Sequence, residues 1–210
     1  MAAEKPSGCI RRPRRPECAS RRSGFALFAV IMLVLVLAIT ATVVVTTLSG
    51  NNDQYRIENA ADVLHRLAAE IDTTRLTSAQ SFRGQVTVYP SKLSQLYTKI
   101  LSGDFQCSST GTSTFGTTNA GKWKGPYHLV PIPTTGLKIA PGFTANNAIS
   151  RVSATVIAVQ MPNSSLDDAK ALELFVDRNG KSDGTGPVVV FSLTDPTTIN
   201  YRINNLGTGC

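Results

Sequence analysis

The chain has 210 residues, which is room for one ordinary domain with extensions. Its formal net charge is +7, but the excess of Lys and Arg is concentrated in residues 1–24 and the rest is nearly neutral. This distribution argues against a nucleic-acid-binding surface.

Residues 1–24 form a basic leader with three prolines and no apolar periodicity. Residues 25–48 follow, without a charge, a proline or a glycine. As a helix this run would measure about 36 Å, against about 30 Å for the hydrocarbon core of a bilayer. We therefore expect a transmembrane helix over 25–48. Because Lys and Arg favour the cytoplasmic side, we expect the N-terminus in the cytoplasm and the remainder outside.

The next segment, residues 49–83, has the pattern of an amphipathic helix. Apolar residues recur at spacings of 3, 4, 3 and 4, at Ile57, Ala60, Leu64, Leu67 and Ile71. No proline separates this segment from the apolar run, so one long helix is expected to continue into it. An apolar stripe on one face requires the remaining chain to pack against it.

Residues 84–210 are expected to form an extracytoplasmic globular head. A short helix is predicted within 89–103, and a Ser/Thr/Gly-rich loop over 107–121. β-Branched and aromatic runs predict strands at 127–132, 152–161, 187–193 and 199–204. A second short helix is predicted over 166–176, capped by Ser164 or Ser165. This order predicts an α+β fold in which the long N-terminal helix packs on a small antiparallel sheet.

The four cysteines divide between the two sides of the expected membrane helix. Cys9 and Cys18 lie in the leader, whereas Cys107 and Cys210 lie in the exported part, where disulfides persist. The two exported cysteines predict one intramolecular bridge, Cys107–Cys210. The alternative is two unpaired thiols.

A basic leader ending in Gly24, then Phe25, then an apolar run continuing into an amphipathic helix resembles the type IV pilin and type II secretion pseudopilin family. The stretches GQVTVYPSKLSQL, GKWKGPYHLVP and DAKALELFVDRNGKSDGTGPV also resemble segments of such proteins. The resemblance implies a pilin-like fold, cleavage between Gly24 and Phe25 by the prepilin peptidase and N-methylation of Phe25. It further implies an inner-membrane protein whose partners are other pilin or pseudopilin subunits.

One position departs from the family pattern. The fifth residue after the expected cleavage site is usually Glu, thought to pair with the N-terminal amine of a neighbouring subunit, and here it is Ala29. Some minor members, notably the one at the filament tip, lack this Glu. The departure therefore favours a minor or initiating subunit over a major one.

The stretch DRNGKSDGTG suggests two interpretations. Some pseudopilins bind calcium in a C-terminal loop, and Asp177, Asn179 and Asp183 supply the hard oxygen atoms that Ca²⁺ prefers. Against an EF-hand, Lys181 stands where another oxygen ligand is expected, and no Glu closes the loop. The alternative is a tight turn at Asn179-Gly180.

No pattern in the sequence predicts an enzyme or a catalytic cofactor. The chain has two histidines, His65 and His128, and no nucleophile motif or phosphate-binding glycine loop. We expect both histidines to be structural. Trp123, between Lys122 and Lys124, is expected to be packed in the head, with a role in partner contact as the alternative.

An ordinary signal peptide remains a second interpretation of the N-terminus. The stretch LAITA before Thr42 loosely resembles a small-residue cleavage site, and Ser20-Arg21-Arg22 resembles part of a twin-arginine signal. The protein would then be an exported or membrane-anchored binding domain.

Overall fold

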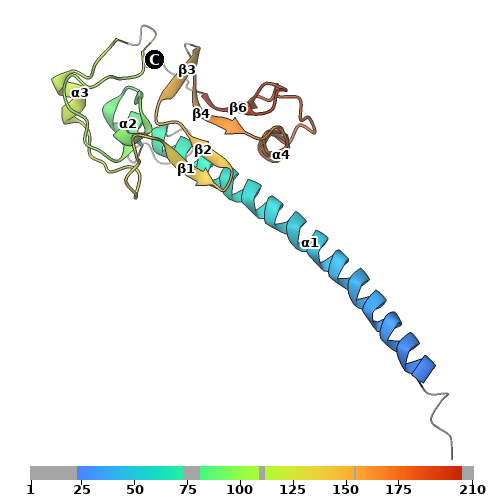
Figure 1. Ribbon diagram of the computed structural model, residues 1–210. Helices are drawn as coiled ribbons and strands as arrows, with labels where there is room; N and C mark the ends of the chain where they lie inside the picture. The colour runs from blue at the N-terminus through green and yellow to red at the C-terminus, as the bar shows by residue number, and fades with distance from the viewer. Residues whose placement is uncertain (1–22, 73–80, 109–111, 154, 205–210) are drawn as a thin grey trace, which may run out of the picture. The chain divides into compact units, whose positions relative to one another are not determined.

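The computed structural model describes residues 23–72, 81–108, 112–153 and 155–204, and at 23–26, 41–51 and 204 the backbone alone. The chain divides into two units, residues 1–50 and 51–210, with the division inside the first helix, α1 (Ser23–Ile71). The described elements are helices and antiparallel strands, which confirms the predicted α+β class (Figure 1).

The second half of α1 packs through the predicted stripe. All five stripe residues are buried, with exposed fractions of 6% for Ile57, 1% for Leu67 and zero for the others. Ala61, beside the stripe, is buried as well. The helix ends at Ile71, whereas the sequence predicts helix to residue 83. The next helix, α2 (Phe82–Val86), begins at a new N-cap, where the Ser81 hydroxyl accepts a hydrogen bond from the Gly84 amide.

A four-stranded antiparallel sheet forms the second layer of the head. Its strands are β3 (Ile149–Ser153), β4 (Val156–Ser164), β6 (Thr197–Asn204) and β5 (Val189–Val190), in this spatial order. β4 and β6 pair over most of their length, and the pairs include Val159 with Tyr201 and Ile157 with Ile203. α4 (Leu166–Asp177) follows β4 and contacts β5 and β6. A separate hairpin joins β1 (Leu137–Ala140) and β2 (Phe143–Ala145).

The predictions for α4 and the last strand are confirmed. α4 begins at the Ser165 N-cap, whose hydroxyl accepts a hydrogen bond from the Asp168 amide. The predicted strand 152–161 is divided between the end of β3 and most of β4, which pair antiparallel. Of the predicted strand 187–193, the two residues of β5 are paired in the sheet.

The strand predicted at 127–132 is wrong. The amides of Tyr127 and His128 both donate to the carbonyl of Leu96 instead of forming a ladder. The prolines at 126, 131 and 133 explain this result, since proline has no amide proton for a central strand. The short helix expected within 89–103 is one turn of 3₁₀ helix, η1 (Leu93–Leu96), and α3 (Thr117–Gly121) lies where a loop was predicted.

The part of α1 that precedes residue 51 has a different surface from the part that follows. Every described side chain from 27 to 40 is exposed, and most of them are large and apolar. Among the residues that the structure describes, no helix combines the length and the apolar character needed to cross a membrane. Part of the predicted span 25–48 lies outside the described side chains.

Candidate functional site

A groove on the head lies between α1 and α4, and we call it the α1–α4 groove. It has a volume of about 830 Å³ and is lined by Asp53, Gln54, Arg56, Ile57, Ser165, Asp167, Asp168, Ala171, Leu174 and Phe175. Its lining combines apolar side chains with three carboxylates and one guanidinium group. Leu174 and Phe175 remain 45% and 36% exposed, so the groove offers apolar surface within reach of negative charge.

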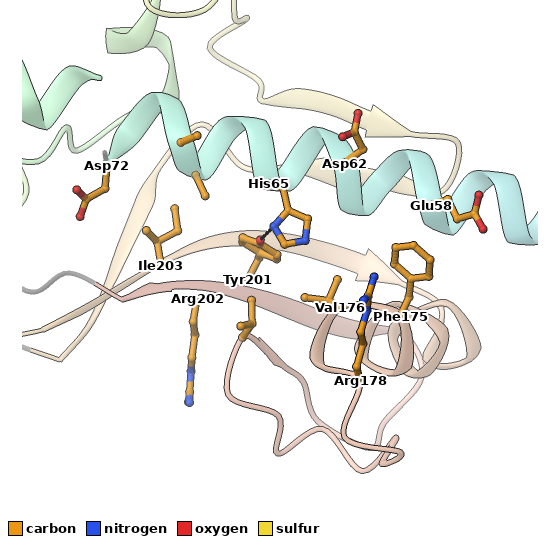
Figure 2. A pocket seen from close by; sticks show the side chains of 13 residues that line it. Glu58, Asp62, His65, Asp72, Phe175, Val176, Arg178, Tyr201, Arg202 and Ile203 are labelled. Atoms are coloured by element: carbon orange, nitrogen blue, oxygen red, sulfur yellow. Dashed lines mark hydrogen bonds between the residues drawn. The ribbon is translucent and has the colours of Figure 1, made fainter. Parts of the chain in front are cut away.

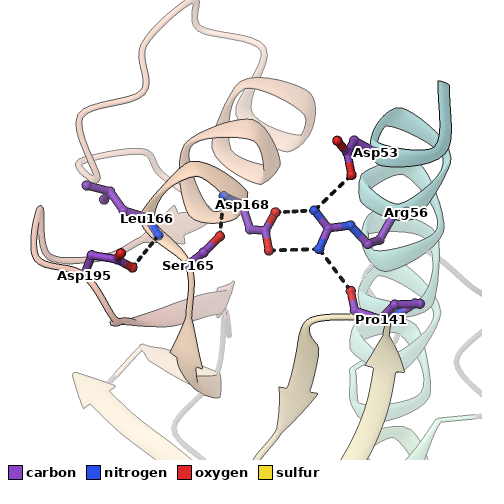
Figure 3. Close-up of polar contacts among 7 residues, drawn as sticks. All are labelled: Asp53, Arg56, Pro141, Ser165, Leu166, Asp168 and Asp195. Atoms are coloured by element: carbon purple, nitrogen blue, oxygen red, sulfur yellow. Dashed lines mark hydrogen bonds and ion pairs between the residues drawn. The ribbon is translucent and has the colours of Figure 1, made fainter. Parts of the chain in front are cut away.

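Arg56 connects three elements at one end of this groove (Figure 3). Its Nη1 and Nη2 donate to the two carboxylate oxygens of Asp168 at 3.0 and 2.5 Å. Nη1 also donates to the carbonyl of Pro141, in the turn between β1 and β2, at 3.4 Å. The Asp53 carboxylate lies 3.4 Å from Nη2. A planar guanidinium group suits this arrangement because it donates in two parallel directions.

Gly142 allows the Arg56–Asp168 pair to approach the hairpin. Its φ of +87° lies in the left-handed region, which strains other residues. A Cβ atom at this position would lie 2.8 Å from Arg56 Nη1 and 3.3 Å from Asp168 Oδ2. A side chain here would therefore both strain the turn and displace the ion pair.

A second cavity, of about 600 Å³, lies between α1 and the segment from α4 to β6 (Figure 2). His65 and Tyr201 point toward one another across it, with 3.0 Å between Nδ1 and the hydroxyl oxygen. The carboxylates of Glu58, Asp62 and Asp72 line it from α1, and Arg178 and Arg202 line it from the other side. His65, expected to be structural, thus joins α1 to the sheet.

A polar cluster holds the end of α1. The Tyr89 hydroxyl donates to the buried Asp72 carboxylate, and Arg83 Nη1 lies 3.3 Å from the same oxygen. The Arg83 guanidinium also lies 4.8 Å from the centre of the Tyr89 ring. Burial raises the pKa of Tyr89 most, and the neighbouring Asp72 carboxylate raises it further. The phenol therefore stays protonated and donates its hydrogen bond to Asp72.

Two carboxylates of α4 organise the loop that follows the helix. Glu173 is fully buried, and its oxygens accept hydrogen bonds from the amides of Gly184 and Gly186 at 2.9 and 2.8 Å. Asp177, one turn later, accepts from the amides of Val188 and Val189 at 2.9 and 3.0 Å. These four bonds bring the loop back to β5.

The three residues proposed for calcium have other partners. Both Asp177 oxygens accept backbone amides, Asn179 accepts from the Lys181 amide, and Asp183 accepts from Thr185. The hydrogen bonds from Thr185 lower the pKa of the exposed Asp183. Gly180 has a φ of +71°, which confirms the predicted positive φ at the Asn179-Gly180 turn.

No group of three or more His, Cys, Asp or Glu side chains is placed to hold a metal ion within the described ranges. Calcium binding by this loop therefore stays a prediction. Carbonyl and amide oxygens are the other ligands it would require.

The stretch containing Trp123 packs against η1. Trp123 is half-buried, and its ring nitrogen donates to the carbonyl of Gln95 at 3.1 Å. It meets Tyr127 edge to face, which confirms packing as its role. His128 Nδ1 lies 2.7 Å from the Glu70 carboxylate on α1. Burial raises the pKa of Glu70, against the opposing effects of His128 and Arg66.

The structure describes no side chain for three of the predicted site residues, Gly24, Phe25 and Cys210. Gly24 and Phe25 fall in the first turn of α1, where the backbone alone is described. Cys107 is 5% exposed, and its amide donates to the carbonyl of Tyr89 at 3.0 Å. Cys210 lies outside the described residues, so the Cys107–Cys210 bridge stays a prediction.

The sequence interpretation missed the α1–α4 groove. The adjacent apolar residues Leu174 and Phe175 gave no clear signal, because consecutive residues on a helix can both lie within one apolar face. The pairing of Arg56 with Asp168 gave no signal either, since more than one hundred residues separate them in sequence.

Comparisons of this chain with protein-family models, with curated proteins and with solved structures find no match.

Proposed function

We propose that this chain is a pilin-like structural subunit of a type II secretion pseudopilus or a type IV pilus. It is processed after Gly24 by the prepilin peptidase and methylated at Phe25. In this proposal residues 25–48 span the inner membrane once, with the N-terminus in the cytoplasm and the head in the periplasm. Its partners are other pilin or pseudopilin subunits, and the protein is not an enzyme.

The observation that carries the proposal is the surface of α1 over residues 27–40. The described side chains there are exposed all around the helix, and those that are large are all apolar. A helix that is apolar on every side is normally covered by lipid or by other apolar helices. A membrane before assembly, and neighbouring subunits after it, would supply both kinds of cover.

The contrast along α1 supports the same proposal. From Ile57 to Ile71 the helix buries one stripe against the head and leaves polar residues outside. The resemblance implies this architecture: a single helix whose surface is first apolar on every side and then apolar on one side only. Ala29 supports a minor or initiating position, because it offers no carboxylate to the amine of a neighbouring subunit.

Mass spectrometry of the mature N-terminus tests the proposal. A start at N-methylated Phe25 is expected. Gly24→Glu places a charged side chain at the scissile bond, and we expect it to leave the precursor uncut. Ser20→Glu is the matched control, since it adds the same charge to the leader and should be processed normally.

Two other outcomes would contradict the proposal. A mature start at Thr42 would favour a protein exported by an ordinary signal peptide, and an intact Met1 would favour an uncleaved membrane anchor. Normal cleavage of the Gly24→Glu variant would also remove the reason for assigning the chain to this family.

A further inference from the structure

The α1–α4 groove has the chemistry of a binding site for a cationic, apolar segment. Its apolar lining includes the exposed faces of Leu174 and Phe175. Two of its lining carboxylates are exposed: Asp53, whose side chain is 73% exposed, and Asp167. Among the described residues Asp167 has no side-chain partner, so its charge faces solvent. An apolar surface beside exposed carboxylates is complementary to a segment that carries Lys beside apolar side chains.

The same chain presents such a segment in residues 122–130, which we call the Lys-Leu loop. Lys122 and Lys124 are both exposed at its start. Leu129 is 91% exposed, the highest fraction of any large apolar side chain in the described part, and Val130 is 60% exposed. These side chains therefore do not occupy the groove of their own chain.

Hydrogen bonds and packing against the head fix the conformation of the Lys-Leu loop. The amides of Tyr127 and His128 donate to the Leu96 carbonyl at 2.7 and 3.2 Å, and the His128 ring pairs with Glu70 on α1. Trp123 and Tyr127 pack against the core. A loop that is already fixed loses less conformational entropy on binding, so its exposed tip is suited to docking.

We propose that the Lys-Leu loop of one copy of this chain docks in the α1–α4 groove of a second copy. Leu129 and Val130 contact Leu174 and Phe175, and the two lysines face Asp53 and Asp167. In the proposed pair each copy gives its loop to the other and receives the other's loop, which is the isologous, closed form of this contact; a one-way contact would continue from copy to copy instead. A closed pair agrees with a minor or initiating subunit, which does not polymerise continuously.

The contact is small, so it depends on a high local concentration of heads. Each of the two loop–groove contacts, with two apolar side chains and two lysines, buries less surface than the roughly 1,600 Å² of a standard interface. Here the inference rests on the proposed function, because a shared membrane brings two heads together and raises their effective concentration. The ionic part of the contact should weaken as salt rises, because exposed charges are screened.

The test uses the full chain in detergent micelles and measures association by sedimentation equilibrium. The groove variant is Asp53→Lys with Asp167→Lys, and the loop variant is Lys122→Glu with Lys124→Glu. Asp168 is left unchanged because Arg56 donates two hydrogen bonds to it, whereas the 73% exposed Asp53 side chain lies 3.4 Å from one Arg56 nitrogen. Lys99→Glu with Lys138→Glu is the matched control, because both lysines are exposed and the net charge changes as in the loop variant.

Each charge-reversed variant alone should associate about tenfold or more weakly than the original chain, since attraction becomes repulsion at two positions. A one-to-one mixture of the two variants should recover the original affinity to within about threefold, because each loop then meets a groove of opposite charge. The control variant should associate as the original does. Recovery in the mixture also shows that both variants are folded.

The inference would be overturned if the original chain were monomeric, or if the variants associated as tightly as the original chain does. It would also be overturned if the mixture did not recover affinity while both variants kept the native circular dichroism. A chain that binds an added Lys- and Leu-containing peptide in the groove but not a second copy would also overturn it. The proposed function is judged separately by the mature N-terminus. A cleaved chain that stays monomeric refutes the docking alone, and a paired chain that is never cleaved at Gly24 refutes the pilin-like assignment alone.

Discussion

Arg56 on α1 and Asp168 on α4 form a two-bond ion pair that joins segments more than one hundred residues apart. The Asp168 side chain is 13% exposed and the Arg56 side chain 25% exposed, so water screens the pair only in part. The Asp168 amide is at the same time bound by the N-cap Ser165. The pair therefore fixes the start of α4 against α1, and with it one wall of the α1–α4 groove.

Asp168→Asn should lower the free energy of unfolding of the head by about 2 kcal/mol, since one Arg56 N–H then faces an NH₂ group and the other donates to an uncharged oxygen. Asp62→Asn is the matched control, because Asp62 pairs with Arg66 with both side chains about two thirds exposed. That change should cost less than about 0.5 kcal/mol. Chemical denaturation followed by tryptophan fluorescence measures both values. Equal losses in the two variants would contradict the structural role given to Arg56–Asp168.

Glu173 gives a second prediction, on the loop after α4. Glu173→Gln replaces one accepting oxygen by an NH₂ group that faces a backbone amide, so one buried amide loses its acceptor. We expect a loss of about 1–3 kcal/mol. Hydrogen exchange at Gly184 and Gly186 should accelerate in this variant. Asp183→Asn, at an exposed position of the same loop, is the control and should leave both amides protected. Unchanged exchange in Glu173→Gln would show that other contacts hold the loop.

The sequence was most informative where one element carries its own pattern. The stripe from Ile57 to Ile71 and the N-cap of α4 depend on local spacing, and both predictions are confirmed. The strand predicted at 127–132 was wrong because the β propensity of its other residues takes no account of the prolines in and beside it. Proline has no amide proton to donate to a neighbouring strand.

Features formed by distant residues could not be predicted in this way. The short hairpin β1–β2 and the α1–α4 groove depend on how α1, α4 and the loops come together. Glu173 illustrates the limit. A charged residue on a helix is usually expected to be exposed, yet this carboxylate is fully buried because two loop amides satisfy it.

Glu70 predicts a pH dependence of stability. Because burial raises its pKa in the folded head above the ordinary value of 4.5, the folded state holds the proton more tightly than the unfolded state does. The resulting stabilisation is complete below 4.5 and is lost as the pH rises through the folded-state pKa. Glu70→Gln should remove this decline, whereas Glu58→Gln, on the same helix, should retain it. Unfolding free energies at a series of pH values measure the difference. Parallel curves for the original chain and Glu70→Gln would contradict the prediction.

The two cysteines that follow the apolar run, Cys107 and Cys210, give a fourth prediction. A Cys107–Cys210 disulfide would close a loop of about 100 residues, worth on the order of 4–5 kcal/mol by chain entropy. Peptide mapping by mass spectrometry without reductant, on protein from the cell envelope, should find one linked pair that reductant separates. Cys107→Ser should remove the linked pair and lower the melting temperature. Two free thiols in the original protein would exclude the bridge.

Ala29 predicts low abundance in any filament to which this chain belongs. A filament interior is apolar, and a buried Glu is tolerated there when it is paired. In the usual subunit the partner would be the N-terminal amine of a neighbour. A chain with Ala29 can offer its own amine to a neighbour's Glu but can offer no carboxylate in return. It can therefore join one side of the assembly contact, which suits a tip or initiating position.

Quantitative mass spectrometry of purified filaments should find this chain at a small fraction of the commonest subunit. Ala29→Glu supplies the missing carboxylate and should raise that fraction, whereas Ala29→Gln, similar in size but uncharged, should not. An equal share for the original chain would show that assembly proceeds without this contact, through packing of the apolar helices over residues 25–48.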